Sequence, residues 1–265
     1  MNIGSLEVGA GQPCRFISEL GNAHNGDFGR ALRLIDAAKA AGADAIKLQC
    51  YTPDELVALR GDGPAPEPWG SQGFTMRTLY EKAATPFEWF EKLFRYCTFA
   101  NSRIPIFSSV FGLESLALLE SLNCPAYKIA RLDNGHSELI VACMKTGKPV
   151  MVSTSKPMTM HGDFERLYCP PGYPTQVADV RLPVFGDLAE WDGAHEAEYS
   201  GFVGLSSHCL APELPIAAVA RGAKLIEMHF HLEAEPSELE ANVSLNEREF
   251  AAMVRSVRAT EELLG

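Results

Sequence analysis

The sequence lacks an apolar run of the ~18 residues that would span a bilayer, so it predicts no transmembrane helix. Its first residues also lack a basic segment followed by an apolar core, the pattern of a secretory signal peptide. We therefore expect a cytoplasmic protein that has no membrane partner.

Positive charge is also scarce, because 23 Lys and Arg residues face 34 Asp and Glu residues, for a formal net charge of −11. A general nucleic-acid binder needs a basic stripe to neutralise phosphates, so this class is excluded. A small anionic substrate stays possible, since it needs only a local cluster of lysines and backbone amides.

Paired cysteines are missing too, since no Cys-x-x-Cys motif occurs and the cysteines are scattered singly. Several stand inside apolar runs, which indicates reduced, buried thiols and not a zinc site or a set of disulfides. The seven are Cys14, Cys50, Cys97, Cys124, Cys143, Cys169 and Cys209.

What the sequence does contain is an alternation of short apolar runs and helical periodicity over 265 residues, about the length of one α/β barrel. The runs predict strands over 15–21, 45–49, 104–109, 126–130, 149–154, 166–169, 202–206 and 224–230. The helices are expected over 28–41, 86–100, 113–122, 137–145, 182–189, 211–222 and 246–264. Eight strands alternating with helices predict a (β/α)8 TIM barrel that forms a single domain over residues 1–265. A doubly wound sheet would usually show a glycine-rich turn after its first strand, and none is present.

Two segments interrupt the alternation. Residues 52–82 are rich in Gly and Pro, which predicts a long surface loop that could serve as a functional lid. Between Thr154 and the strand at 166–169 there are barely enough residues for a crossover, so the helix after the fifth strand is expected to be shortened or missing.

Almost every predicted strand ends in polar residues, where the active sites of such barrels gather. Lys47 and Lys128 lie inside apolar strands, and a buried lysine needs a partner. An anionic ligand would serve both lysines; the alternative is that each pairs with a nearby carboxylate such as Glu19 or Asp133. Serines at three strand ends add hydroxyl donors for phosphate or carboxylate oxygens.

Two short apolar runs end in His208 and His229, separated by one helix-like segment. Neighbouring strand ends can bring two imidazoles to one metal ion, although both could be ordinary core or rim histidines. Together with the lysines and serines, they predict a site where a phosphorylated or carboxylated small molecule reacts with metal help.

Eight motifs in order make the sequence resemble the sialic acid synthase family from about residue 15 to 264. They are Ile17-Ser-Glu-Leu-Gly-Asn-Ala-His-Asn-Gly-Asp, Ala43-Asp-Ala-Ile-Lys-Leu-Gln, Phe107-Ser-Ser-Val-Phe, Tyr127-Lys-Ile-Ala, Val152-Ser-Thr, Gly172-Tyr-Pro, Gly204-Leu-Ser-Ser-His and Gly222-Ala-Lys-Leu-Ile-Glu-Met-His-Phe. The resemblance implies a (β/α)8 barrel that condenses phosphoenolpyruvate with an aldose such as N-acetylmannosamine, giving a 2-keto sugar acid and phosphate.

The resemblance also implies roles for single residues. The positions that hold phosphoenolpyruvate are matched by Lys47, Gln49, Ser109, Lys128, Ser153 and Ser206. His208 and His229 match the ligands of a manganese or magnesium ion. Tyr173, Asp133 and Glu240 match positions that contact the sugar or assist proton transfer, and Glu19 matches the acidic residue of the first strand.

Several residues depart from the family pattern. Ser207 stands where an aspartate is usual beside the metal histidine, and Arg131 replaces a small residue after Lys-Ile-Ala. The milder changes are Ser109 for threonine, Asp133 for glutamate, Tyr168 for histidine, Pro171 for asparagine and Glu240 for aspartate.

Family members normally carry a further C-terminal antifreeze-like domain, which gives an arginine to the sugar site of the partner subunit. The sequence reaches Gly265 with the last barrel helix. Unless another chain supplies that domain, the resemblance implies an incomplete sugar site, an aldehyde other than the standard one and a possible homodimer through another interface. Two alternatives stay open: a non-catalytic anion-binding barrel, and an aldolase or lyase that forms a Schiff base on Lys128.

Overall fold

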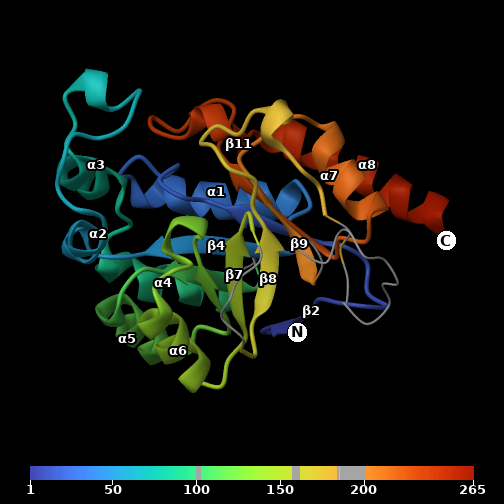
Figure 1. Ribbon diagram of the computed structural model, residues 1–265, viewed down its shortest axis with the longest axis horizontal. Helices are drawn as coiled ribbons and strands as arrows, with labels where there is room; N and C mark the ends of the chain where they lie inside the picture. Colours follow the sequence, from blue (N-terminus) through green and yellow to red (C-terminus); the bar gives the residue numbers. More distant parts are fainter. Residues whose placement is uncertain (100–102, 157–161, 184, 186–200) are drawn as a thin grey trace.

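A closed barrel of parallel strands forms the centre of the chain in a computed structural model that describes residues 1–99, 103–156, 162–183, 185 and 201–265 (Figure 1). The strands are β3 (Arg15–Glu19), β4 (Ala45–Cys50), β5 (Ile106–Val110), β6 (Tyr127–Ile129), β7 (Val150–Thr154), β8 (Glu165–Tyr168), β9 (Phe202–Ser207) and β10 (Leu225–Phe230). Each strand pairs with the next, and β10 closes the barrel by pairing with both β9 and β3. The prediction of a (β/α)8 barrel is confirmed.

Helices surround the barrel and follow the strands in the predicted order (Figure 1). They are α1 (Phe28–Ala40), α4 (Phe87–Phe99), α5 (Leu113–Ser121), α6 (Ser137–Lys145), α7 (Glu213–Ala220) and α8 (Glu247–Leu264). Local side chains define several starts: Asp27 accepts a hydrogen bond from the backbone of Arg30 at α1, and Asn246 forms a capping box with Glu249 at α8.

The strands are buried on both faces, because the helices cover the outside and side chains fill the inside. At one point the strands β9 and β10 approach so closely that only glycine fits: a Cβ at Gly204 would lie 2.2 Å from the carbonyl oxygen of Leu225. This contact is part of the closure of the barrel.

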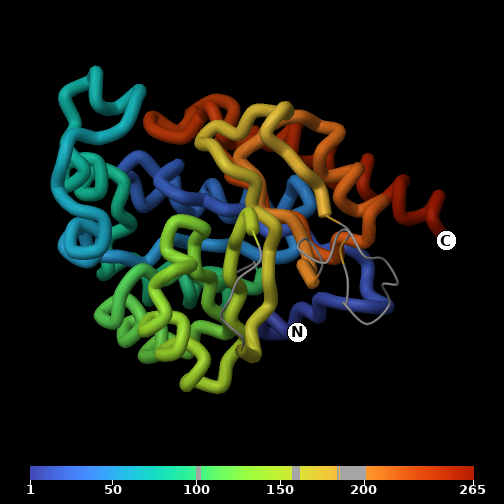
Figure 2. The backbone as a smooth tube through the Cα atoms, viewed as in Figure 1, coloured from blue at the N-terminus to red at the C-terminus, as the bar shows by residue number. Residues whose placement is uncertain are grey.

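The prediction of a long loop over 52–82 is wrong in that the segment is partly helical. It contains α2 (Pro53–Arg60), the 3-10 turn η1 (Gly70–Gln72) and α3 (Met76–Ala83). Thr52 begins α2 with a capping box to Glu55, and Thr75 begins α3 in the same way with Thr78. The capped helices were hidden by the glycines and prolines between them. In the backbone trace this segment forms the end of the molecule farthest from the C-terminus (Figure 2).

Other differences are small. The hairpin of β1 (Asn2–Ile3) and β2 (Leu6–Glu7) and the strand β11 (Ser244–Leu245) were not predicted, because two residues are too short for any periodicity. The described residues between β7 and β8 form no helix, in line with a shortened connection. Residues 184 and 186–189 of the helix predicted over 182–189, and the end of the one over 86–100, lie outside the described residues. Nowhere in the described ranges is there a helix long and apolar enough to cross a bilayer.

Candidate active site

The strand register places one set of polar side chains on the inner face of the barrel. Residues paired across parallel strands point to the same side, and alternate residues of a strand point to opposite sides. Lys47 pairs with Glu19, Gln49 with Ser109, and Ser109 with Lys128. Continuing around the barrel, the same face carries Met151 and Ser153 on β7, Leu167 on β8, Ser206 on β9, and Glu227 and His229 on β10.

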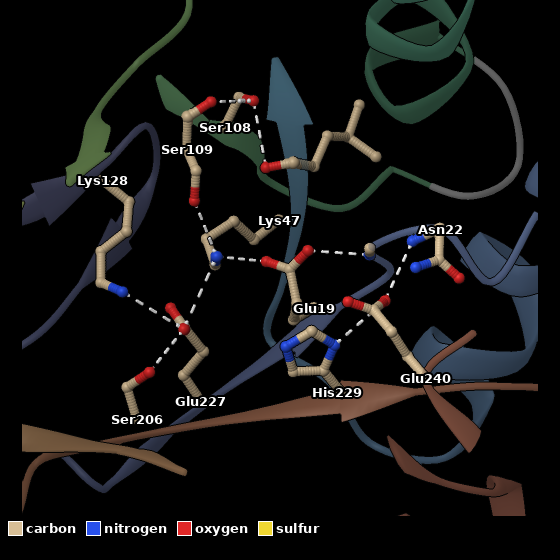
Figure 3. A network of polar contacts seen from close by, with 12 residues as sticks. Glu19, Asn22, Lys47, Ser108, Ser109, Lys128, Ser206, Glu227, His229 and Glu240 are labelled. Carbon is tan, nitrogen blue, oxygen red and sulfur yellow. Dashed lines mark hydrogen bonds and ion pairs between the residues drawn. The ribbon is translucent and has the colours of Figure 1, made fainter. Parts of the chain in front are cut away.

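A network of two lysines and two glutamates occupies this face (Figure 3). Lys47 forms an ion pair with Glu19, lies 3.6 Å from Glu227 Oε1 and donates a 2.9 Å hydrogen bond to Ser109 Oγ. Lys128 Nζ lies 3.3 Å from the same Glu227 oxygen. Glu227 therefore joins both lysines.

The pKa values in this network follow from burial and charge. Burial alone would raise the pKa of Glu227, but Lys128 and Lys47 outweigh it and lower that pKa to about 2. Burial lowers the pKa of Lys128, only partly offset by Glu227. For Lys47, Glu19 and Glu227 outweigh burial and raise the pKa.

The two lysines thus have carboxylate partners within the protein, as the alternative interpretation of the sequence held. For Lys47 the partner is the expected Glu19, whereas Lys128 pairs with Glu227. Asp133 is not a partner of either, because Arg60 binds it with two hydrogen bonds to Oδ1 and one of 2.6 Å to Oδ2. Two positive and two negative charges balance on this face.

His208 and His229 lie beside the network with their ring centroids 5.2 Å apart. His208 Nδ1 is buried and has no hydrogen-bond partner, and burial lowers the pKa of His208 to about 3. Its imidazole is therefore neutral at neutral pH and has a lone pair to offer. His229 Nδ1 lies 3.6 Å from Glu240 Oε2; burial would lower the pKa of His229, but Glu240 raises it overall.

These two imidazoles fit the ligands of a divalent ion, because two ring nitrogens at this spacing can reach one centre and His208 Nδ1 has no other partner. Within the described residues, no group of three or more His, Cys, Asp and Glu side chains stands ready to hold a metal. An ion held here would therefore take its remaining ligands from water or a substrate.

Glu240 fixes the position of His229. Glu240 Oε2 accepts a 3.1 Å hydrogen bond from the backbone of Asn22, and its other oxygen accepts one from the hydroxyl of Tyr173. Gly21 makes this approach possible: its φ is +47°, and a Cβ there would lie 2.2 Å from Glu240 Oε2. The ring of Tyr173 lies 4.5 Å from that of His208, so Tyr173 contacts both histidines.

The structure brings together nearly all of the predicted site residues at one end of the barrel. Gln49 lies beside Ser109, Ser206 donates a 2.8 Å hydrogen bond to Glu227, and the Ser153 hydroxyl is buried without a partner. Asp133 lies apart on the 3-10 turn η2 (Arg131–Asp133) and is bound to Arg60.

The predicted set of site residues omitted Glu227, which the structure places between the two lysines. The signal was its position two residues before His229 in the same strand, which puts both on one face. Asn22 and Arg60 were also missed, since a backbone donor and a partner from a distant helix leave no pattern in the sequence.

A closed parallel barrel whose strand ends gather acids, lysines and a pair of histidines at one mouth defines a barrel enzyme. Comparison with known proteins gives the family: residues 34–265 match the NeuB family, and the chain belongs to it.

Among curated relatives, pseudaminic acid synthase of Campylobacter jejuni is 36% identical over 94% of this chain and 74% of its own length. Human N-acetylneuraminate-9-phosphate synthase is 29% identical over 97% of this chain and 73% of its own. These relatives are synthases, and the chain is an enzyme of their class.

Solved structures show the same fold. The N-acetylneuraminic acid synthetase of Leptospira borgpetersenii superposes with a TM-score of 0.80 at 25% identity, over 100% of this chain and 90% of that one. The spore coat polysaccharide biosynthesis protein SpsE of Bacillus subtilis gives 0.78 at 29% identity, over 100% of this chain and 72% of that one.

Proposed function

We propose that the chain condenses phosphoenolpyruvate with an aldose or a related aldehyde, of the N-acetylmannosamine type, to a 2-keto sugar acid and releases phosphate. The observation that carries the proposal is the inner-face network of Lys47, Lys128, Glu227 and the strand-end serines, beside a histidine pair, in a member of a family of sugar-acid synthases.

In this proposal phosphoenolpyruvate lies over the lysine network. Lysines and hydroxyls bind its carboxylate and phosphate and hold the enol carbon toward the aldehyde, so that much of the acceleration comes from positioning. The residues that we assign to this half are Lys47, Gln49, Ser109, Lys128, Ser153 and Ser206.

The sugar half of the site lies toward the histidines. His208 and His229 would hold a manganese or magnesium ion, which when bound polarises the aldehyde as a Lewis acid. Glu240 keeps His229 in place, and Tyr173 closes this side. We assign contacts with the sugar or proton transfer to Glu19, Tyr173 and Glu240. Asp133, which the resemblance also places in this set, lies apart in its ion pair with Arg60.

The chemistry balances with these parts. The enol carbon attacks the aldehyde carbon and forms the new carbon–carbon bond, while the aldehyde oxygen takes up a proton. Water adds to the cationic C2 that results and loses a proton, and phosphate then leaves by cleavage of the C–O bond. A carboxylate such as Glu19, 1% exposed and held by Gly21 and Lys47, is placed to accept a proton.

The test is phosphate release from phosphoenolpyruvate in the presence of manganese and a panel of aldoses and N-acetylated amino sugars. We expect release that depends on one aldose and on the metal and that is lost in Lys128→Met. Binding of phosphoenolpyruvate without release from any aldose would support the non-catalytic alternative instead.

The Schiff-base alternative has its own readout, because the burial that lowers the pKa of Lys128 also favours a neutral amine. Borohydride reduction in the presence of pyruvate leaves no covalent adduct on Lys128 if the proposal is right. An adduct that disappears in Lys128→Met contradicts it.

A further inference from the structure

Arg131 has an unusual position at the mouth of the barrel. It opens η2, the turn that directly follows β6, the strand of Lys128. The side chain is half-buried, and its Nε is buried with no hydrogen-bond partner. Within the described part of the chain no carboxylate forms an ion pair with it, whereas its neighbour Asp133 is bound by Arg60.

An uncompensated guanidinium in such a place needs a reason. Partly burying a charge costs free energy unless a partner takes the place of water. The lysines of the inner face have found such partners, since Glu19 and Glu227 neutralise Lys47 and Lys128. A phosphorylated carboxylate that enters the site meets a charge-balanced network, and the excess positive charge nearby comes from Arg131.

A second buried donor lies on β7, the strand against which η2 packs. The Ser153 side chain is 1% exposed and its hydroxyl has no partner. Ser153 lies two residues beyond Met151, which pairs with Lys128, so its side chain points to the inner face. Asn134, which ends the turn that holds Arg131, donates a 3.2 Å hydrogen bond from Nδ2 to the Ser153 carbonyl oxygen, so this turn is fixed against β7.

Cys169, the residue directly after β8, lies near both Lys128 and Arg131. Cys169 stands two residues beyond Leu167, which pairs with Ser153, so its thiol lies on the same face. Burial raises the pKa of this thiol, while Lys128 and then Arg131 act in the opposite direction. The charges of Lys128 and Arg131 both act on this buried thiol, which is consistent with the position of η2 directly after β6.

We propose that Arg131, together with Lys128 and the Ser153 hydroxyl, binds the phosphate group of the substrate. This inference rests on the proposed function and adds to it a phosphate contact particular to this chain. The fork of a guanidinium matches two phosphate oxygens, which a small neutral side chain at this position does not offer.

The test is titration calorimetry with phosphoenolpyruvate, inorganic phosphate and pyruvate on the unchanged protein, Arg131→Met and Arg131→Lys. Loss of a charged hydrogen-bond donor is expected to weaken phosphoenolpyruvate and phosphate binding about tenfold or more, with Arg131→Lys between the two. Pyruvate, which has no phosphate, is expected to bind equally to all three proteins or to none of them.

The matched control is Arg255→Met, which removes one positive charge from the exposed face of α8 and should leave all three ligands unaffected. Thermal unfolding separates binding from structure: Arg131 has no ion pair in the described chain, so Arg131→Met should unfold at the same temperature as the unchanged protein or slightly higher.

Each other outcome decides something. If Arg131→Met binds phosphate and phosphoenolpyruvate as tightly as the unchanged protein does, the assignment of Arg131 is overturned and the proposed function stands. The same holds if Arg255→Met loses as much affinity as Arg131→Met. A drop of several degrees in the unfolding temperature indicates a structural role and overturns the assignment as well. If phosphate binding depends on Arg131 but no aldose is ever condensed, the phosphate contact stands and the proposed function fails. No phosphate or phosphoenolpyruvate binding by the unchanged protein overturns the contact.

Discussion

Glu227 shows how one residue can set the charge state of the whole inner face. Its Oε1 accepts from Ser206 and lies 3.3 and 3.6 Å from the two lysine Nζ atoms, and all three charged side chains are nearly fully buried. Neither lysine can be removed from this arrangement without leaving part of a negative charge uncompensated.

Replacing Glu227 with leucine is therefore expected to reduce the free energy of unfolding by about 3–5 kcal/mol, because Lys128 is left as an unpaired buried cation. The double variant Lys128→Met with Glu227→Leu should regain most of this loss, since Lys47 keeps Glu19. Urea unfolding of the single and double variants measures the coupling. Additive losses would show that the pair does not interact.

Gly21 is a second residue whose identity the site requires. Gly21→Ala places an alanine at a strained positive φ and brings its Cβ against Glu240. We expect the free energy of unfolding to fall by about 3 kcal/mol and His229 to be held less firmly by Glu240. Gly26→Ala is the matched control, because its φ is +75° but nothing lies within 4 Å of the new Cβ. The free energy of unfolding of Gly26→Ala should fall by only about 1 kcal/mol. Equal losses in urea unfolding would mean that the Glu240 contact does not matter.

His24 supplies a dependence of stability on pH. It is 3% exposed and lies between Thr85 Oγ1 and the backbone of Gly26. Burial lowers its pKa from 6.5 to about 4 in the folded state. The unfolded chain thus binds a proton at a higher pH than the folded one, so this contribution is complete above about pH 6.5 and is lost as the pH falls toward 4.

The expected result is that the unchanged protein loses about 2 kcal/mol more stability than His24→Gln between about pH 7.5 and 5. Urea unfolding of both proteins at the two pH values provides the measurement. Parallel losses in the two proteins would show that His24 is protonated in the folded state or accessible to solvent.

At the scale of elements, the segment with α2 and α3 is docked on the barrel by a few strong contacts. Arg60, the last residue of α2, holds Asp133 on η2, and Glu55 of α2 accepts hydrogen bonds from the first backbone N–H groups of α5. On the other side Lys82 of α3 forms a 2.7 Å ion pair with Glu238. The ring of Trp69, between the two helices, lies 6.2 Å from that of Tyr173, so the segment borders the site.

Removing the Arg60 contact should loosen this segment without unfolding the barrel. We expect Arg60→Met to make residues 52–83 several times more sensitive to limited proteolysis, because buried Asp133 loses its only guanidinium partner in the described chain. The control Arg77→Met breaks exposed pairs with Asp54 and Asp62 in the same segment and should change little. Similar digestion of the two variants would contradict a special role for Arg60.

The elements also show where sequence patterns are informative. Strands such as β4 and β10 were predictable because apolar residues alternate with Lys47, Gln49, Glu227 and His229, and that alternation also predicted which side chains share a face. The partner of Asp133 was not predictable, because it depends on how α2, some seventy residues earlier in the chain, docks on η2. The helices α2 and α3 begin at capping residues. Both helices are short and stand among glycines and prolines, so their capping signals are hard to recognise in the sequence.

At the scale of the whole molecule, the fold followed from the sequence because a barrel repeats one pattern around a circle. The ion pairs inside it did not follow, since Glu227 meets Lys128 only after β10 has closed against β3 and β9. Closure between distant segments determines which acid neutralises which base.

A ligand that binds this closed barrel should stabilise it as one unit. Phosphoenolpyruvate with manganese is expected to raise the unfolding temperature in proportion to the logarithm of ligand concentration, by an amount that corresponds to about 2.7 kcal/mol at a hundredfold excess over Kd. The pair His208→Ala and His229→Ala should lose the manganese-dependent part alone. No shift with either ligand at millimolar concentration would contradict a ligand site in the mouth.

The sharing of Glu227 by both lysines has a consequence for descent. A lineage that loses Glu227 is left with Lys128 as a buried unbalanced charge, so the next accepted change should fall on Lys128, whereas Lys47 keeps Glu19. We expect related barrels to keep Lys128 and Glu227 together or to replace them together, with few stable intermediates. The pair could then serve as a marker for telling, from genome sequences alone, which distant branches have kept this pocket and which have abandoned it.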